Sequence, residues 1–196
     1  MRELFGKLPG VSVSELPAFL KSLQGERSFG LRRNPLKYTG EEFEREMPFS
    51  LRKVPWAQEG YFYDGEEQPG KSPYHASGAF YIQEPSAMIA AELLGAEPGE
   101  CIMDLCAAPG GKSTQIAGKM QGKGLLVCNE YVPARAEILA QNMERTGVSN
   151  CVILKESAER CAECFPLFFD RVLVDAPCSG EGMFRKEEQA LLHWSP

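Results

Sequence analysis

The chain has 196 residues, of which 43% are hydrophobic, and a formal net charge of −6 at pH 7. This apolar content is enough to bury a core, so the composition excludes a disordered chain and predicts one globular domain, alone or with a smaller appendage. The acidic balance argues against a protein that coats nucleic acid, because such binding depends on basic side chains that neutralise phosphates.

The N-terminal residues lack the apolar run of a signal peptide, and no stretch approaches the roughly 18 apolar residues that a membrane span needs. We therefore expect a cytoplasmic protein with no membrane partner. Seven cysteines, an odd number, favour reduced thiols over disulfides. Cys161 and Cys164 form a C-x-x-C pair, but His75 and His193 are both distant in sequence, so we expect no metal site.

Residues 1–72 are rich in Pro and Gly and predict a small N-terminal α+β domain with short helices over 14–23 and 41–46. The aromatic run 61–63 is expected to be core rather than a stacking platform. A Pro- and Gly-containing loop over 68–73 separates this part from residues 73–196.

From residue 84 onwards, helical and strand patterns alternate. The helices are expected over 84–94, 112–120 and 133–145, and the strands over 101–105, 124–129, 151–155 and 171–175. This alternation predicts a parallel sheet covered by helices, an α/β fold of the Rossmann-like kind. In such sheets ligands bind outside the carboxyl ends of the strands, so the residues after each strand are the candidates for a site.

Small residues and glycines follow the first of these strands and open a helix, an arrangement that brings bare backbone amides close to a ligand. The residues are Cys106, Ala107, Ala108, Pro109, Gly110, Gly111 and Lys112. This segment is not a phosphate loop, because Cys106 stands where that loop needs its first glycine, and it also lacks the G-x-G-x-x-G pattern. A carboxylate is therefore the expected guest.

Polar residues follow the second and third strands. Glu130 is placed to accept hydrogen bonds from both hydroxyls of a ribose, although an acid there can also be a helix cap. Ser157 either lies by an adenine or caps a helix, and the sequence leaves these two alternatives even. A nucleoside that carries a carboxylate fits these positions, and S-adenosylmethionine is such a ligand.

The fourth strand leads into a carboxylate and a thiol, Asp175 and Cys178, with Pro177 between them. Enzymes that methylate exocyclic amines usually present an Asn or Asp, two prolines and an aromatic residue here. Pro-Cys is instead typical of enzymes that methylate a pyrimidine carbon.

The two motifs together resemble the NOP/Sun family of RNA (cytosine-5) methyltransferases. The motifs are Asp104-Leu105-Cys106-Ala107-Ala108-Pro109-Gly110-Gly111-Lys112 and Asp175-Ala176-Pro177-Cys178-Ser179-Gly180-Glu181-Gly182. Segments 30–37, 54–56 and 81–88 are also similar to family signatures, so the resemblance covers nearly the whole chain. The continuation over 181–186 resembles the bacterial RsmF-type branch, whose members modify cytidines in 16S ribosomal RNA.

The resemblance implies a role for each candidate residue. Residues 106–112 would wrap the methionine part of the cofactor, and Glu130 would hold its ribose. Ser157 or Glu156 would face the adenine, Arg135 would brace Glu130 rather than touch the cofactor, and Asp175 would sit between cofactor and cytosine. The basic stretch over 27–37 would contact RNA, with a solvated surface as the alternative.

The family's chemistry uses a cysteine thiolate that adds to C6 of cytosine and makes C5 nucleophilic. Cys178 is implied to assist release of the methylated base, whereas the nucleophile belongs to a later strand outside this chain. We therefore expect an N-terminal portion of a longer enzyme, with an incomplete sheet, that binds cofactor but does not turn over RNA. The alternative is a non-catalytic RNA-binding or ribosome assembly factor that retains the cofactor pocket.

Overall fold

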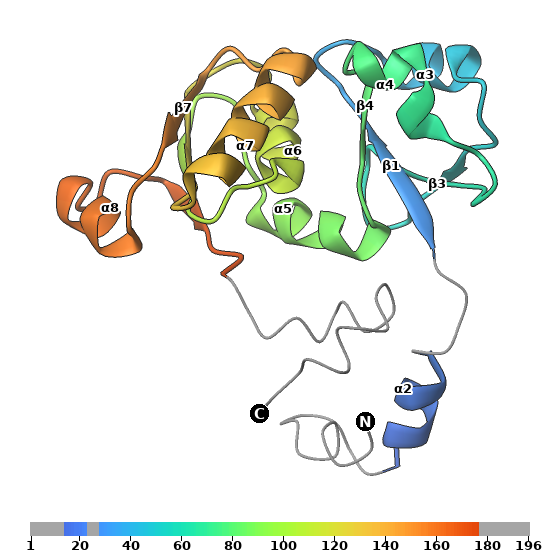
Figure 1. Ribbon diagram of the computed structural model, residues 1–196, viewed down its shortest axis with the longest axis horizontal. Coiled ribbons are helices and arrows are strands. Elements are labelled where there is room, and N and C mark those ends of the chain that lie inside the picture. Colours follow the sequence, from blue (N-terminus) through green and yellow to red (C-terminus); the bar gives the residue numbers. More distant parts are fainter. Residues whose placement is uncertain (1–13, 23–27, 177–196) are drawn as a thin grey trace. The chain divides into compact units, whose positions relative to one another are not determined.

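The computed structural model describes residues 14–22 and 28–176. Helix α2 (Leu16–Ser22) is described by itself, and Ser28–Ala176 form one compact unit that contains two four-stranded sheets (Figure 1). No helix in these two ranges is long and apolar enough to cross a membrane.

The first sheet is antiparallel, with strand order β2-β3-β1-β4. Its strands are β1 (Phe29–Arg33), β2 (Arg52–Lys53), β3 (Gly60–Tyr63) and β4 (Phe80–Ile82), and α3 (Gly40–Glu46), α4 (Pro73–Ala76) and the 3-10 turn η1 (Pro69–Lys71) connect them. Leu31, Phe43, Tyr61 and Phe80 form its fully buried core. Tyr61 is thus core, as the sequence predicts, and its neighbours Phe62 and Tyr63 are half-buried beside core clusters.

Helix α3 shows why a short polar segment is helical at this place. The Thr39 hydroxyl accepts a hydrogen bond from the Glu42 N–H at 3.3 Å, and the Glu42 carboxylate accepts one from the Thr39 N–H at 3.0 Å. This reciprocal cap satisfies N–H groups that have no partner within the helix. Phe43 then faces the core, so one apolar side chain anchors the helix on the sheet.

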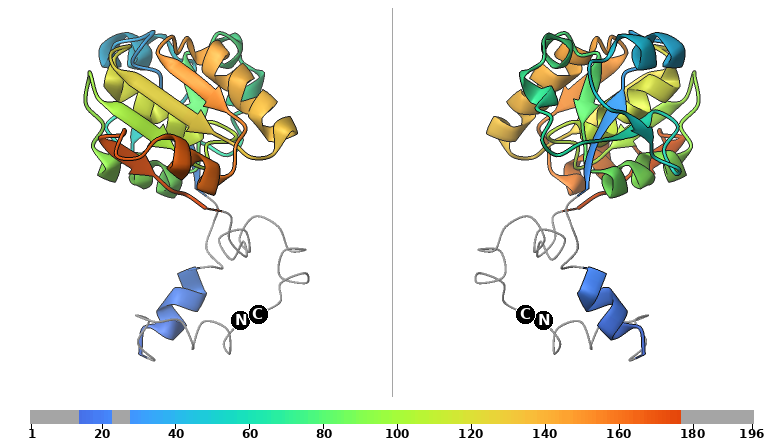
Figure 2. Two further views of the ribbon diagram at one scale, coloured as in Figure 1. Left: turned by 90° about the vertical axis from the view of Figure 1, so that its left-hand side faces the viewer. Right: turned by 90° about the vertical axis from the view of Figure 1, so that its right-hand side faces the viewer.

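The second sheet is parallel, with strand order β7-β6-β5-β8, and its strands run side by side in the left view of Figure 2. The strands are β5 (Cys101–Asp104), β6 (Leu125–Asn129), β7 (Cys151–Leu154) and β8 (Arg171–Leu173). All four lie where the sequence predicts them, which confirms the Rossmann-like α/β class. Helices α6 (Gly111–Met120) and α7 (Pro133–Thr146) connect the first three strands, and α8 (Ala158–Cys164) precedes β8.

One face of the parallel sheet is packed against α5 (Ile89–Leu94), α6 and α7. The buried cluster there includes Ile102 and Leu126 from the strands, and Ile116 and Leu139 from the helices. The helix predicted over 84–94 is divided into a 3-10 turn, η2 (Pro85–Met88), followed by α5.

The antiparallel sheet is held on the helical layer of the parallel sheet by close polar contacts. The Asn34 side-chain amide donates to the carbonyls of Gly78 and Thr146, at 2.9 and 2.8 Å. A Cβ on Gly118 of α6 would lie 2.8 Å from the Pro35 ring, so a glycine is required for this approach. The predicted division at residues 72 and 73 stays a prediction; the first sheet takes in β4, which follows it in the chain.

Candidate functional site

The four parallel strands end at one edge of their sheet, here called the carboxyl edge. Backbone hydrogen bonds tie the segment after each strand to its neighbour: Ala107 N–H to Asn129 O at 2.8 Å, Glu130 N–H to Leu154 O at 3.1 Å, and Leu105 N–H to Leu173 O at 2.9 Å. Residues that are far apart in sequence therefore meet at this edge, as expected for a parallel α/β sheet.

The glycine-rich loop, residues 106–112, leaves β5 and starts α6. Gly110 precedes the helix at φ 111°, which a side chain would disfavour, and a Cβ there would lie 3.2 Å from Leu139. Ala107 and Ala108 are buried. The first N–H groups of α6 have no acceptor within the helix and carry its partial positive charge, so this loop suits an anionic group.

Glu130 follows β6 and is 4% exposed. One carboxylate oxygen accepts a hydrogen bond from the Val132 N–H at 3.0 Å, and the other lies 3.4 Å from the Arg135 guanidinium. Val132, not Glu130, is the N-cap of α7. Arg135 also donates to the Ala108 carbonyl at 2.9 Å, so this arginine connects Glu130 to the glycine-rich loop.

Ser157 follows β7 as the N-cap of α8, and its hydroxyl accepts a hydrogen bond from the Arg160 N–H at 3.2 Å. Of the two alternatives for this residue, the structure contains the helix cap. A role for Ser157 or Glu156 beside an adenine stays a prediction.

The fourth strand end also adjoins the glycine-rich loop, because the Lys112 ammonium forms an ion pair with the Asp175 carboxylate. Asp175 is more than half exposed, with 57% of its side chain accessible. Cys178 lies outside the described residues. Cys106 is half-buried, and burial raises the pKa of its thiol, so it is protonated at neutral pH.

Asp104 is a candidate that the sequence prediction did not include. Its side chain is 1% exposed; one oxygen accepts a hydrogen bond from the Ser113 hydroxyl at 2.7 Å, and Oδ1 has no hydrogen-bond partner within residues 14–22 and 28–176. Burial raises the pKa of this carboxyl to about 6, against the opposing effect of the Ser113 hydrogen bond. Its signals in the sequence are an acid at the end of an apolar strand and its place as the first residue of the glycine-rich motif.

Asn129 is a second residue that the sequence prediction does not include. Its amide donates to the carbonyls of Leu105 and Glu156 at 3.1 and 2.9 Å, and its oxygen accepts from the Glu156 N–H at 3.0 Å. A single buried side chain thus fixes the segments that follow β5 and β7. It positions the carboxyl edge rather than presenting a group to a ligand.

The expectation that residues 27–37 contact RNA is wrong for Arg32. This residue is 3% exposed, and its guanidinium donates hydrogen bonds inside the protein. Arg33 pairs with Glu59, with 11% of its side chain exposed, and the Lys37 ammonium binds the carbonyls of Ser77 and Arg145. Arg27 lies outside the described residues. The positive groups of this stretch that the structure describes therefore stabilise the fold.

The C-x-x-C pair lies on α8, with Cys161 buried and Cys164 exposed. Among residues 14–22 and 28–176 there is no group of three or more His, Cys, Asp or Glu side chains arranged to hold a metal ion.

A parallel sheet of this order, with a glycine-rich loop after β5 and an acid after β6, defines a Rossmann-like methyltransferase core. A solved methyltransferase homolog protein from Pyrococcus horikoshii is similar over 91% of this chain and 59% of its own, with a TM-score of 0.80 and 27% identity. NSun6 from the same organism, solved with SFG, has the same fold, with a TM-score of 0.76 and 19% identity over 91% of this chain and 70% of its own.

The family described as 16S rRNA methyltransferase RsmB/F matches residues 91–195, and the N-terminal domain of 16S rRNA methyltransferase RsmF matches residues 2–85. The chain belongs to this RsmB/F family, which confirms the resemblance found in the sequence.

Curated relatives include "Ribosomal RNA small subunit methyltransferase F" of Pectobacterium carotovorum, 39% identical over 91% of this chain and 39% of the relative. The protein of that name from Shewanella oneidensis is 41% identical over 84% of this chain and 36% of the relative. The chain thus spans about two fifths of the length of these relatives.

Proposed function

We propose that this chain binds S-adenosylmethionine at the carboxyl edge of the parallel sheet. Three features of the chain fit that cofactor. The first turn of α6 offers N–H groups to the methionine carboxylate. The Glu130 oxygens, each with one neighbour in the structure, retain lone pairs for the ribose hydroxyls. The buried Oδ1 of Asp104, at the end of β5 where the loop begins, has no hydrogen-bond partner among the described residues.

The observation that carries this proposal is the connection made by Arg135. Its guanidinium lies 3.4 Å from Glu130 and donates to Ala108 at 2.9 Å, so the expected ribose acceptor is attached to the expected methionine loop. Two motifs separated by about twenty residues are thereby held at a fixed spacing, as a ligand that spans both would require.

Within this site we assign the roles that the sequence suggested. The residues of the glycine-rich loop surround the methionine part, Ser157 or Glu156 borders the adenine, and Asp175 faces the space between cofactor and substrate. Arg135 acts through Glu130 as a positioning residue. The ion pair with Lys112 directs the Asp175 carboxylate towards the loop.

We further propose that the whole protein methylates C5 of a cytidine in 16S ribosomal RNA. The support is membership of the RsmB/F family and the run Asp175-Ala176-Pro177-Cys178, which resembles that of enzymes acting on a pyrimidine carbon. A cysteine thiolate would add to C6, C5 would take the methyl group, and loss of the C5 proton would restore the ring and expel the thiolate. Bound S-adenosylmethionine supplies the methyl group.

In this scheme Asp175 hydrogen-bonds the edge of the cytosine and stabilises the ring during addition. Cys178 assists release of the methylated base, and the nucleophilic cysteine belongs to the part of the protein outside this chain. The substrate is small-subunit RNA, and the protein acts in the cytoplasm. A base within a helix must leave its stack to reach Asp175, at a cost of a few kcal/mol that RNA backbone contacts offset.

The test is the position of the methyl group that the full-length protein adds to 16S ribosomal RNA. Mass spectrometry of nucleosides after nuclease digestion should detect 5-methylcytidine. Asp175→Asn should lower its formation at least about a hundredfold, because a charged hydrogen-bonding group at the reacting base is lost. Asp64→Asn changes an exposed acid directly after β3. It serves as the matched control and should leave the rate unchanged.

Two results would contradict the proposal. One is a methyl group on another atom or another base. The other is RNA binding without any methyl transfer, which would favour the alternative of an assembly factor.

A further inference from the structure

The buried Arg32 joins the antiparallel sheet to the start of α6. We propose that Arg32 is a positioning residue for the glycine-rich loop, so that the antiparallel sheet sets the affinity of this chain for S-adenosylmethionine. The inference rests on the cofactor site proposed above and goes beyond it, because it assigns a part in cofactor binding to a domain expected to contact RNA.

Arg32 lies on β1 and reaches the first turn of α6 with both terminal nitrogens. One donates to the Gly111 carbonyl at 2.7 Å and to the Gln115 side-chain oxygen at 3.4 Å. The other donates to the Thr114 hydroxyl at 2.7 Å, and that hydroxyl donates in turn to the Gly110 carbonyl at 2.7 Å. The guanidinium therefore holds two successive carbonyls, one directly and one through Thr114.

Those two carbonyls decide where the donors of the proposed site point. In a trans peptide the C=O and the next N–H point in opposite directions. Holding the carbonyls of Gly110 and Gly111 on the side of Arg32 therefore directs the N–H groups of Gly111 and Lys112 away from it. Both are first-turn N–H groups, which have no acceptor within the helix and are free to bind a carboxylate.

The Thr114 N–H already binds the Gly110 carbonyl at 2.9 Å, and the Arg32 contacts add a second support where two glycines adjoin. Glycine has the least restricted backbone, so the peptide units around Gly110 and Gly111 have many accessible orientations. Gly110 adopts a φ of 111°. Fixing the peptide units before the ligand arrives removes an ordering cost that binding would otherwise carry.

Arginine is suited to this role despite its burial. The planar fork lets it serve several acceptors at once, whereas a lysine ammonium acts as a compact point charge. Burial lowers the pKa of Arg32 to about 10, so it stays protonated at neutral pH. Its hydrogen-bond acceptors are carbonyl, hydroxyl and amide oxygens, with Glu59 and Glu92 contributing at longer range.

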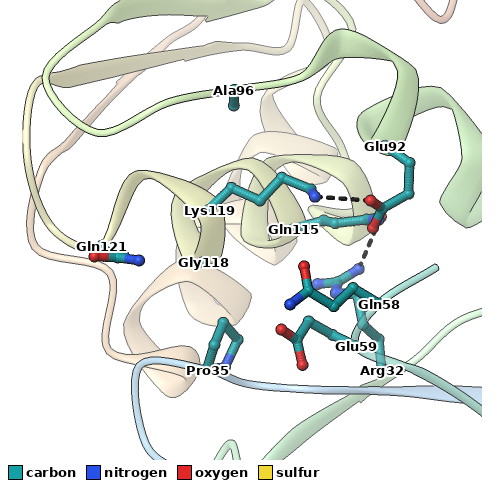
Figure 3. Close-up of a pocket in the computed structure, with 10 residues that line it drawn as sticks. All are labelled: Arg32, Pro35, Gln58, Glu59, Glu92, Ala96, Gln115, Gly118, Lys119 and Gln121. Atoms are coloured by element: carbon teal, nitrogen blue, oxygen red, sulfur yellow. Dashed lines mark hydrogen bonds and ion pairs between the residues drawn. The ribbon is translucent and has the colours of Figure 1, made fainter.

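Gln115, which accepts from Arg32, is itself fixed on the side away from the loop. Its amide donates to Glu92 at 2.8 Å and to the Met88 carbonyl at 3.0 Å, and Glu92 also pairs with Lys119 at 2.7 Å. Figure 3 shows Arg32, Gln115, Glu92 and Lys119 in the wall of a cavity of about 340 Å³ that β1, α5 and α6 help to line. Arg32 thus lies between the glycine-rich loop and Gln115, which is itself hydrogen-bonded to the Glu92–Lys119 ion pair.

Lys37 provides a matched control. It belongs to the same segment, and its ammonium also donates to backbone carbonyls near a helix end, those of Ser77 at 2.6 Å and Arg145 at 2.8 Å. That helix end is the C-terminus of α7, whereas Arg32 binds the N-terminus of α6. Loss of either should weaken the docking of the antiparallel sheet, but only loss of Arg32 should alter the glycine-rich loop.

The experiment compares Arg32→Lys, Arg32→Met and Lys37→Met in this chain, with calorimetric titration of S-adenosylmethionine and thermal unfolding of each variant. Both Arg32 changes should raise the dissociation constant about tenfold, the effect of losing hydrogen bonds from a charged donor. Lys37→Met should lower the melting temperature with a dissociation constant within about twofold of the unaltered chain.

Hydrogen exchange supplies a readout that needs no ligand. The Gly110 and Thr114 amides, which bind the Ala107 and Gly110 carbonyls, should exchange faster in Arg32→Lys and at the original rate in Lys37→Met. An unchanged dissociation constant in folded Arg32→Lys would overturn the inference. It would also be overturned if the affinity for S-adenosylmethionine fell in proportion to the melting temperature in all three variants, Lys37→Met included. Absence of binding by the unaltered chain would instead overturn the cofactor proposal, and this inference with it.

Discussion

Asp104 combines nearly complete burial with a carboxyl group at the centre of the carboxyl edge. Its Oδ2 accepts a hydrogen bond from the Ser113 hydroxyl, but Oδ1 has no partner in the part of the chain that the structure describes. A charged group in this setting carries a desolvation penalty, which is why the pKa is raised to about 6. A residue placed in this way destabilises the chain at neutral pH and is typical of a functional position.

The folded state therefore holds the Asp104 proton more tightly than the unfolded state, whose pKa is near 3.8. The free energy of unfolding should fall as pH rises from about 4 to about 6, by up to roughly 3 kcal/mol from this residue. Asp104→Asn removes that dependence and still accepts from Ser113. Urea unfolding from pH 4 to 7 should show the unaltered chain losing stability relative to the variant, whereas parallel curves would contradict the burial effect.

Sequence patterns select candidate site residues more readily than they predict the burial and contacts of a residue. Glu130 and residues 106–112 could be selected because they follow strands. Arg32 could not be recognised as buried, because its partners Gly111 and Thr114 lie about eighty positions further along the chain. Ser157 remained ambiguous because a cap and a ligand contact demand the same residue type.

Among the elements, the antiparallel sheet meets the helical layer of the parallel sheet where a loop before β4 passes the end of α7. Gly78 lies there at φ 72°, and a Cβ on it would fall 2.0 Å from the Arg145 carbonyl oxygen. That contact is with backbone, which cannot move aside without displacing the helix end. The close approach of these elements thus depends on the absence of a side chain.

Gly78→Ala should destabilise the chain by about 3 kcal/mol or more, from backbone strain together with the clash. Gly122→Ala is the matched control, since Gly122 has a φ of 71° with nothing within 4 Å of a Cβ. It should cost only the strain, about 1 to 2 kcal/mol. Denaturant unfolding measures both, and equal losses would show that the sheets do not pack closely at this point.

The element predictions succeeded where apolar periodicity is strong, as in β5, β6, β7 and β8, and strand ends differed by one or two residues. The helix expected over 84–94 begins instead as a 3-10 turn at Pro85. No local pattern specifies the antiparallel order β2-β3-β1-β4, because strand pairing joins residues far apart in sequence.

At the scale of the whole molecule, the antiparallel sheet contacts both ends of the site's helical layer. Arg32 binds the start of α6, and Asn34 and Lys37 bind the end of α7. The class and the family could be recognised from two motifs, since small residues and strand-end acids fall at the positions that such a site needs. The contacts that attach the antiparallel sheet to the helical layer could be identified only in the structure.

The proposed position of S-adenosylmethionine in this chain is between the glycine-rich loop and Glu130. Calorimetric titration of S-adenosylmethionine into the unaltered chain, Glu130→Ala and Glu137→Ala tests it most directly. Glu137 is an exposed acid on the neighbouring α7, so its removal controls for the loss of a negative charge. We predict saturable binding that Glu130→Ala weakens by about 1 to 3 kcal/mol and Glu137→Ala leaves unchanged. No binding at millimolar cofactor, or equal binding by all three proteins, would contradict a cofactor site at Glu130.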